Sequence, residues 1–445
     1  APKFGALATP DKPVASVDPA VQAVLSRLLA HNPAERHSDA LEVLRDLSAS
    51  TGLSLIEETA ATRESFLQAA ALVGRGIELD VLTGALREAR LGKGSTWLIA
   101  GESGSGKSRL VDELRTLALV QEARVLRGQA VREGSGAYHV LREALEWLCL
   151  DVPLSEQVVA TLSTIVPSLT ERLPRSVPEP PNQDARSLQE RAINTIVGLF
   201  ETAAVNRLHP VVLILEDLQW VGRECLTLLG RLSDLSLRSS LLILGTFRDD
   251  EQPTLPAAVP DAKILKLRRL DEASITLLAE SILGPAGRNA ELIDFLIRES
   301  EGNPFFIVEI MRALAEHAGE LGSVTQTKLP AQILTGGVRA VLRRRLHQAE
   351  PWAQPLLELA AVLGRQIEPR ILLHSQAATA MAGHSLDAWL RQLNDFCIIE
   401  LRDTRWRFSH DKLRECMLEQ LRAANRLQEL HKQGELGKLR ADHTL

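Results

Sequence analysis

The chain has 445 residues, of which 45% are hydrophobic and 24% are charged, and its formal net charge is −6. Because a single hydrophobic core stops growing at roughly 250–300 residues, this length predicts several domains. The acidic balance excludes a general electrostatic attraction to nucleic acid or anionic membranes. No apolar run reaches the roughly 20 residues of a membrane-spanning helix, and the cysteines show neither metal-ligand spacing nor a disulfide framework. We therefore expect a cytoplasmic protein without a membrane partner.

Two short helices are predicted within residues 17–47, on either side of a break at Asn32 and Pro33. Ser38 or Asp39 can cap the second helix. A polar linker is predicted over residues 48–68. Because residue 1 is alanine and no signal-peptide pattern follows it, we expect the chain to be a segment of a longer protein.

Strands and helices alternate from residue 72 to about residue 270. Such alternation predicts an α/β fold, in which helices cover both faces of a parallel sheet. An insertion at residues 150–190 contains a Pro-rich stretch, 177–184, that is expected to be a surface loop. The β-prone apolar runs lie at residues 96–100, 124–129, 211–215, 241–246 and 263–267.

Helical patterns dominate after residue 271. They are predicted at residues 271–283, 288–300, 304–317, 337–348 and 351–363. Residues 384–408 are predicted to form a helix and then a short hairpin that looks like the wing of a winged helix. The tail, residues 410–440, is expected to be helical and charged.

The stretch GESGSGKS, from Gly101 to Ser108, fits the pattern G-x-x-x-x-G-K-[ST] between a predicted strand and a predicted helix. Glycines let backbone N–H groups turn toward a phosphate, and the helix N-terminus adds a partial positive charge. In such a loop Lys107 reaches the β- and γ-phosphates and Ser108 ligates Mg²⁺. The alternative is an accidental turn. The predicted phosphate-binding residues are Gly101, Glu102, Ser103, Gly104, Ser105, Gly106, Lys107, Ser108 and Arg109.

Two carboxylates end the apolar run VVLILED at residues 211–217. Glu216 sits where an acid that holds Mg²⁺ is needed, and Asp217 sits where a base can orient the attacking water. Arg248 follows the next apolar run and could contact the γ-phosphate. The alternatives are a plain strand-to-loop junction for the acids, and for Arg248 a surface salt bridge with Asp249 or Asp250.

Several segments, in their order, resemble the signal-transduction ATPases with numerous domains (STAND), which belong to the AAA+-related P-loop class. They are LVGRGIELDVLTGAL, the phosphate loop, LILEDLQW, GTFRD, SEGNPFFIVEIMRAL, LAAVLGR and RFSHDKLRECM. The resemblance covers about residues 70–430. It implies a P-loop ATPase core of the ASCE type at 69–270, a helical lid at 271–335, a winged-helix-like domain at 336–430, and the start of a C-terminal helical region at 431–445.

The sequence departs from this family at three places. Gly76 stands where Glu is more frequent, Glu216 and Asp217 stand where Asp-Asp or Asp-Glu is typical, and Val221 follows Trp220 where Ala is common. Because the Asp217 side chain is one methylene shorter than that of Glu, we expect slow ATP hydrolysis.

The resemblance also implies nucleotide contacts outside the loop. Gly74 and Arg75 would lie beside the adenine or ribose, Pro304 would pack near the adenine, and His410 would contact the β-phosphate of ADP from the far domain. Pro304 can alternatively be a simple first-turn proline, and His410 a surface histidine capped by Asp411. With these contacts, exchange of ADP for ATP would break the bridge through His410 and expose surface for a partner.

Residues 1–47 resemble the C-terminal helices of a bacterial serine/threonine protein kinase domain. Arg36 matches the arginine that supports the kinase C-lobe, and His37 replaces the proline that usually follows. The chain has no glycine-rich kinase loop and no His-Arg-Asp or Asp-Phe-Gly motif, so it cannot carry kinase catalysis. The expected function is therefore an ATP-binding regulatory switch with slow hydrolysis, using ATP/ADP and Mg²⁺, within a larger kinase–ATPase signalling protein that binds a protein partner or self-associates.

Two other classes of function stay open at this point. A ring-forming AAA+ motor would need an arginine finger across a subunit interface, for which Arg231 and Arg238 are only guesses. A winged-helix DNA-binding regulator would need a basic face, but the arginines of the helix at 336–348 are spread around it. DNA is therefore an unlikely partner.

Overall fold

The computed structural model describes residues 19–30, 32, 35–37, 40–51, 72–131, 136–152, 154–166, 169, 185–205, 209–318, 331–381, 383–402 and 405–442. The chain forms two compact units, residues 1–62 and 63–445. The predicted caps Ser38 and Asp39, nearly all of the linker, and the Pro-rich stretch at 177–184 lie outside the described residues.

The first unit contains two helices, α1 (Pro19–Leu28) and α2 (Ala40–Thr51). Arg27 of α1 forms ion pairs with Glu42 and Asp46 of α2. Arg36, between the helices, donates a hydrogen bond from Nε to the carbonyl oxygen of Ala30 at 2.9 Å. These contacts hold the two predicted helices together as a helical hairpin.

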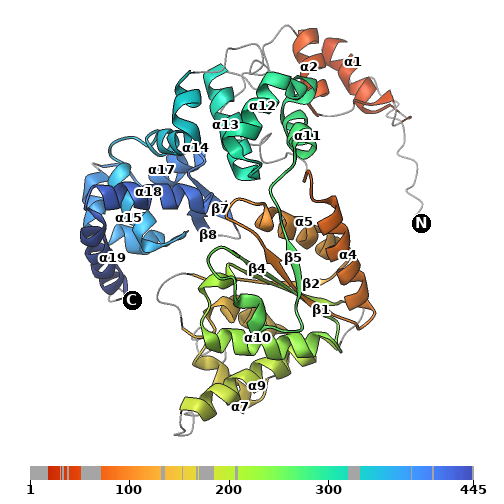
Figure 1. Cartoon of the computed structure of the whole chain (residues 1–445), viewed down its shortest axis with the longest axis vertical. Helices are drawn as coiled ribbons and strands as arrows, with labels where there is room; N and C mark the ends of the chain where they lie inside the picture. The colour runs from red at the N-terminus through yellow and green to blue at the C-terminus, as the bar shows by residue number, and fades with distance from the viewer. Residues whose placement is uncertain are drawn as a thin grey trace. The chain divides into compact units, whose positions relative to one another are not determined.

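The second unit is built on a parallel five-stranded sheet, so the predicted α/β fold is confirmed (Figure 1). The strand order is β2-β3-β4-β1-β5, which places β4 between the strand that precedes the phosphate loop and the strand that ends in two acids. The strands are β1 (Ser95–Ala100), β2 (Arg124–Gln129), β3 (Val211–Glu216), β4 (Leu241–Phe247) and β5 (Lys263–Lys266). All five begin and end within one residue of the predicted runs.

Helices cover both faces of this sheet (Figure 1). On one face lie α4 (Gly76–Arg90) and α5 (Lys107–Val120), and on the other lie α6 (Arg142–Asp151), α7 (Glu156–Ser163), α9 (Ala185–Ala203) and α10 (Arg223–Ser236). The sequence of strand β3 is apolar throughout because both of its faces are covered by helices. Leu213 and Leu215 pack into the second group of helices, whereas Val212 and Ile214 pack into the first.

Three helices follow the sheet: α11 (Glu272–Leu283), α12 (Ala290–Ser300) and α13 (Pro304–Ala318). Asp271 and Asn289 cap the first two by accepting hydrogen bonds from backbone N–H groups in the first turn. Helix α14 (Ala331–Leu346) begins earlier than predicted, and it is interrupted at Gly337, whose φ of 57° is not helical. The predicted start at residue 337 therefore coincides with this break.

The remaining elements are α15 (Gln354–Leu363), β6 (Gln366–Ile367), α16 (Pro369–Leu373), α17 (Leu386–Asp395), β7 (Ile399–Arg402), β8 (Arg405–Phe408), α18 (Asp411–Ala423) and α19 (Leu427–Asp442). The three strands form an antiparallel sheet in the order β6-β8-β7. The predicted hairpin is β7 and β8, whereas the two-residue strand β6 was too short to be predicted. We refer to residues 72–270 as the core and to residues 331–442 as the C-terminal region. No described helix is both long enough and apolar enough to cross a membrane.

A buried ion pair ties α13 to the C-terminal region. Glu309 lies between Arg312 and Arg345, and Arg345 also donates from Nε to the carbonyl oxygen of Phe396 at 2.9 Å. Burial opposes ionisation of Glu309, but the two arginines outweigh it and lower its pKa to about 2. The carboxylate is therefore charged at neutral pH and depends on these partners.

Replacing Arg345 by Met should destabilise the protein strongly, because the buried Glu309 carboxylate keeps only Arg312 and the carbonyl oxygens of Phe396 and Cys397 lose their donor. We expect the free energy of unfolding to fall by about 3 kcal/mol in urea denaturation at pH 7. The control is Arg426→Met, which breaks an exposed pair with Glu358 and should cost at most about 1 kcal/mol. An equal fall in the free energy of unfolding in the two variants would show that the buried pair contributes no more to stability than the exposed one.

Candidate functional site

The loop from Gly101 to Gly106 joins β1 to α5 and is held by backbone conformations that favour glycine. Gly104 and Gly106 have φ values of 88° and 95°, and Gly106 is the N-cap of α5. A Cβ atom on Gly104 would lie 2.6 Å from Oδ1 of Asn303. The glycines are therefore needed both for the turn of the loop and for its close approach to the segment before α13.

Lys107 and Ser108 are the first residues of α5. The ammonium group of Lys107 is buried and donates hydrogen bonds to the carbonyl oxygens of Gly101 at 2.6 Å and Glu102 at 2.8 Å. Burial, followed by the nearby charge of Arg248, lowers the pKa of Lys107 to about 8. Arg109, the third residue of the helix, is exposed.

Glu216, the last residue of β3, is fully enclosed and faces Ser108. The Ser108 hydroxyl donates to Oε2 of Glu216 at 2.8 Å, and Nε of Arg127 donates to Oε1 at 2.8 Å. Although burial raises the pKa of Glu216, the Arg127 charge lowers it to about 2. The hydroxyl and carboxylate oxygens fit Mg²⁺, which usually takes one or two protein carboxylates and fills its shell with water and phosphate oxygens. No cluster of three acid, His or Cys ligands occurs among the described residues.

Asp217 follows β3 in a left-handed conformation, with a φ of 60°. Its backbone N–H donates to the hydroxyl of Thr246 on β4 at 3.2 Å. Its Oδ2 atom accepts hydrogen bonds from Gln129 at 2.9 Å and from Arg365 of the C-terminal region at 3.0 Å. Burial raises the pKa of Asp217, and the charge of Arg365 opposes this. The carboxylate at the end of β3 is therefore in contact with a residue from far along the chain.

Arg248 follows β4 and is buried. It forms ion pairs with Asp411 and Glu415 of α18, and with Glu251 on its own side. The alternative of a surface salt bridge with Asp249 or Asp250 is wrong, because Asp249 pairs with Lys266 and Arg248 reaches into the C-terminal region.

Arg75 and Asn303 form hydrogen bonds to the backbone of the loop at residues 101–106. Arg75 is buried and donates from Nη2 to the carbonyl oxygen of Ser105 at 3.0 Å. Gly74, with a φ of 68°, packs so closely that a Cβ there would lie 2.7 Å from the hydroxyl of Ser274. Asn303 donates from Nδ2 to the carbonyl oxygen of Ser103 at 3.0 Å, next to Pro304, which begins α13.

His410 is the N-cap of α18 and is not capped by Asp411, in contrast to the alternative considered above. Its Nδ1 atom accepts a hydrogen bond from the backbone N–H of Lys412 at 3.1 Å. The ring stacks on Phe305 of α13 with a centroid separation of 3.6 Å. Burial lowers the pKa of His410 to about 3, so the ring is neutral. Because Nδ1 accepts, the ring proton lies on Nε2.

The structure thus brings together most of the predicted site residues, whose individual roles stay predictions. Residues 101–108 contact Arg75 on one side and Glu216 on the other. Four partners were not predicted: Arg127, Gln129, Asn303 and Arg365. A signal for the first two exists in the sequence, since charged and polar side chains interrupt the apolar run of β2.

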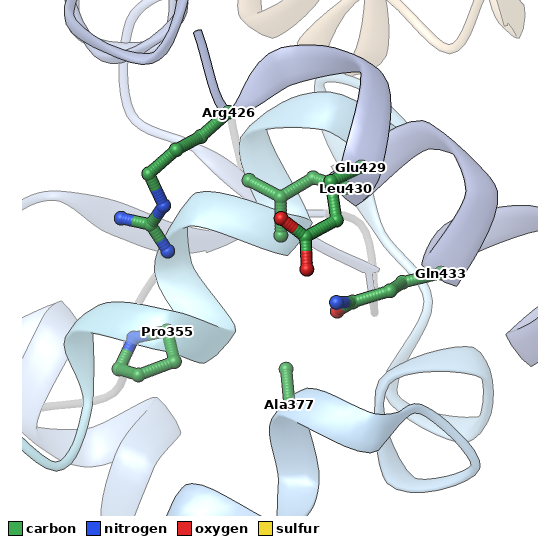
Figure 2. Close-up of a pocket in the computed structure, with 6 residues that line it drawn as sticks. All are labelled: Pro355, Ala377, Arg426, Glu429, Leu430 and Gln433. Carbon is green, nitrogen blue, oxygen red and sulfur yellow. The ribbon is translucent and has the colours of Figure 1, made fainter. Parts of the chain in front are cut away.

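A separate pocket of about 200 Å³ lies within the C-terminal region (Figure 2). Pro355 and Ala377 form one side of it, and the segment at residues 426–433 forms the other (Figure 2). None of the predicted phosphate- or metal-binding residues lines this pocket.

The core sequence matches a known family over most of the sheet. Residues 71–244 match the model of the AAA ATPase domain. This segment is therefore similar to AAA ATPase domains. The similarity supports nucleotide binding, and the geometry of the loop, Lys107, Ser108 and Glu216 agrees with it.

Similarity to individual proteins is weaker. An uncharacterized protein of Rhizobium meliloti (strain 1021) is 27% identical over 319 residues, which is 66% of this chain but only 30% of that protein. The solved Walker-type ATPase of Pyrococcus abyssi is 17% identical, with a TM-score of 0.34 over 78% of this chain and 96% of that one. Cdc6p of Pyrobaculum aerophilum is 14% identical, with a TM-score of 0.38 over 81% of this chain and 98% of that one.

The pKa of Lys107 predicts that nucleotide binding to the phosphate loop takes up protons near pH 8.5. The free ammonium group is partly deprotonated there, and a bound phosphate raises its pKa again. Affinity for ATP should therefore fall as the pH rises through 8, by at most about tenfold per pH unit.

Titration calorimetry at pH 8.5, in buffers of different ionisation enthalpy, measures this uptake directly. A Lys107→Arg variant is the control, because its side chain does not titrate in this range and should show no uptake. The same apparent binding enthalpy in all buffers for the parent protein would contradict the expectation.

Proposed function

We propose that this chain is a nucleotide-dependent regulatory switch of the STAND type, which binds ATP with Mg²⁺ and hydrolyses it slowly. The observation that carries the proposal is the contact of the C-terminal region with the nucleotide site. Arg365 pairs with Asp217, Asp411 pairs with Arg248, and His410 stacks on Phe305 beside the loop. A change at the phosphate site can therefore alter how the C-terminal region is held.

In this proposal the core residues divide the work of binding and hydrolysis. Backbone N–H groups of residues 101–106 and the ammonium group of Lys107 hold the phosphates. Ser108 and Glu216 would hold Mg²⁺, which would draw charge from the β- and γ-phosphate oxygens. Asp217 orients the attacking water, and Arg248 responds to the γ-phosphate. Slow hydrolysis agrees with the present engagement of Asp217 and Arg248 by other side chains.

The antiparallel sheet with its flanking helices supports a winged-helix interpretation of residues 336–430. A role in packing is favoured over DNA binding, because Arg345 is buried against Glu309 and is not available to a phosphate backbone. The two helices of the first unit support the interpretation of residues 1–47 as the end of a kinase-like domain. The switch would then act between that domain and a protein partner or a second copy of the chain, in the cytoplasm.

The proposed division of roles is tested by two substitutions. Lys107→Ala should remove detectable ATP binding in calorimetry, because the loop loses its buried cation. Asp217→Asn should keep ATP affinity within about threefold of the parent and slow hydrolysis by about 10²-fold or more, because the carboxylate that orients water is lost.

Turnover is measured under saturating Mg·ATP, with released phosphate as the readout. If Lys107→Ala bound ATP with the affinity of the parent, residues 101–108 would not be the nucleotide site. Parental turnover in Asp217→Asn would remove Asp217 from the hydrolysis step while leaving the binding site intact.

The proposed bridge through His410 predicts a selective effect on ADP. His410→Ala should speed ADP release, because the neutral ring donates one hydrogen bond through Nε2–H, worth about tenfold. ATP affinity should change less. Release of a fluorescent ADP analogue in stopped flow measures the effect, and His410→Asn, which keeps an N–H donor, is the matched control. Equal losses for ADP and ATP would exclude a switch role for His410.

A further inference from the structure

The core and the C-terminal region meet through charged side chains. Among the described residues, the two hydrophobic clusters of the sheet contain no residue of the C-terminal region. The cluster of α11–α13 includes Leu270, the last residue of the core, and Val341 of α14. The ion pairs between them join Arg248 to Asp411 and Glu415, Arg365 to Asp217, Arg402 to Asp112, and Arg405 to Glu143. Such an interface is held by groups that can exchange one ion pair for another.

The contact between α13 and the C-terminal region is of a different kind. Phe305 and Phe306 of α13 pack against the hydrophobic cluster of the C-terminal region, and Val341 of α14 belongs to the cluster of α11–α13. The buried Glu309–Arg345 pair lies at the same contact. Separating these elements would expose apolar surface and a buried charge, so we expect α13 and the C-terminal region to move together.

Arg365 is the arginine that crosses from the C-terminal region to the end of β3. Its Nη1 atom lies 3.0 Å from Oδ2 of Asp217, and its Nε atom lies 3.2 Å from Oδ1 of Asp411. The Asp217 oxygen that it contacts also accepts from Gln129. The lone pairs on Oδ2 are therefore already used, and Oδ1 accepts a hydrogen bond from Gln219 at 3.3 Å. An attacking water would have to compete with these donors for the carboxylate.

Each member of this network has a second partner on its own side of the interface. Arg365 keeps Asp411, and Asp217 keeps Gln129. Arg248 likewise keeps Glu251, and Glu415 keeps Lys412. Breaking a buried ion pair is costly when it leaves one charge alone. Here Arg365, Arg248, Asp411 and Glu415 each keep a charged partner, and Asp217 keeps a neutral hydrogen-bond donor while it becomes accessible to water. The ionic interface between the core and the C-terminal region can therefore separate at low cost in free energy.

We propose that Arg365 is a positioning residue that blocks Asp217 in the closed arrangement, so that ATP hydrolysis requires the C-terminal region to withdraw. The proposal rests on the proposed function, in which Asp217 orients the attacking water. Binding of nucleotide alone does not require withdrawal, because Lys107 and Ser108 bond to Gly101, Glu102 and Glu216, and in the described part of the chain none of these bonds involves Arg365. The same movement releases Arg248 from Asp411, so base and phosphate sensor become available together.

The test compares Arg365→Ala, Arg365→Lys and the control Arg426→Ala, whose ion pair with Glu358 lies within the C-terminal region. Arg365→Ala should raise kcat about tenfold under saturating Mg·ATP and leave the Kd for ATP within about threefold. Arg365→Lys should lie between this variant and the parent, because it keeps the charge but not the forked geometry. Arg426→Ala should match the parent.

A second readout needs no nucleotide. Amide hydrogen exchange of the free protein should be faster in Arg365→Ala than in the parent at residues 211–222 and 405–415, the segments that carry Asp217 and Asp411, the two partners of Arg365. In the parent protein, kcat should also rise with NaCl, since salt screens ion pairs, and this rise should be smaller in Arg365→Ala. The salt dependence of the parent decides the question if Arg365→Ala does not fold.

A fall in kcat in Arg365→Ala would overturn the proposal and would indicate instead that Arg365 acts on the transferred phosphate. Unchanged kcat and unchanged exchange, or a parent rate independent of salt, would also overturn it. Failure of the proposed function has a different signature: the parent protein would not bind ATP at all, whatever residue stands at position 365.

Discussion

The burial of two carboxylates at the end of β3 is the constraint on which the rest of the site depends. Glu216 and Asp217 are both almost inaccessible to water. A buried charge needs partners, because the loss of hydration costs several kcal/mol per ion. Ser108 and Arg127 meet this need for Glu216, and Gln129 and Arg365 meet it for Asp217. The elements α5, β2 and the C-terminal region therefore each supply a partner at the end of β3.

The phosphate loop is held from two sides by residues that are far from it in the sequence. Arg75 bonds to the carbonyl oxygen of Ser105, and Asn303 bonds to that of Ser103. Because Asn303 directly precedes α13, the loop is in contact with the helix that packs against the C-terminal region. The loop, α13 and the C-terminal region therefore form a continuous path of contacts.

Two interfaces of different chemistry give the molecule a means of responding to nucleotide. Apolar packing and the buried Glu309–Arg345 pair join α13 to the C-terminal region, whereas exchangeable ion pairs join that region to the core. Apolar contacts lose free energy in proportion to the area exposed, but an ion pair with a second partner can be exchanged at low cost. The ionic interface is therefore the one expected to open, and it is the interface that includes Asp217 and Arg248.

The sequence by itself determined the α/β fold, the bounds of the five parallel strands to within one residue, and the loop at residues 101–108. Each of these depends on local pattern: apolar runs, glycine spacing, and the change from strand to helix. It also placed Glu216 and Asp217 at a strand end. The early start of α14 and the short strand β6 could not be predicted, because a helix broken at a glycine and a two-residue strand show little hydrophobic periodicity.

Only the tertiary structure decided which side chains meet at those carboxylates. Arg365 lies 148 residues after Asp217, and Arg127 lies 89 residues before Glu216. The sequence shows where each charged residue stands, but which residue it pairs with depends on how distant elements pack. The same holds for Arg248, whose neighbours Asp249 and Asp250 suggested a local pair while packing gave it Asp411. Local order follows from short-range sterics and burial, whereas pairing of charges is fixed only when the elements that carry them come together.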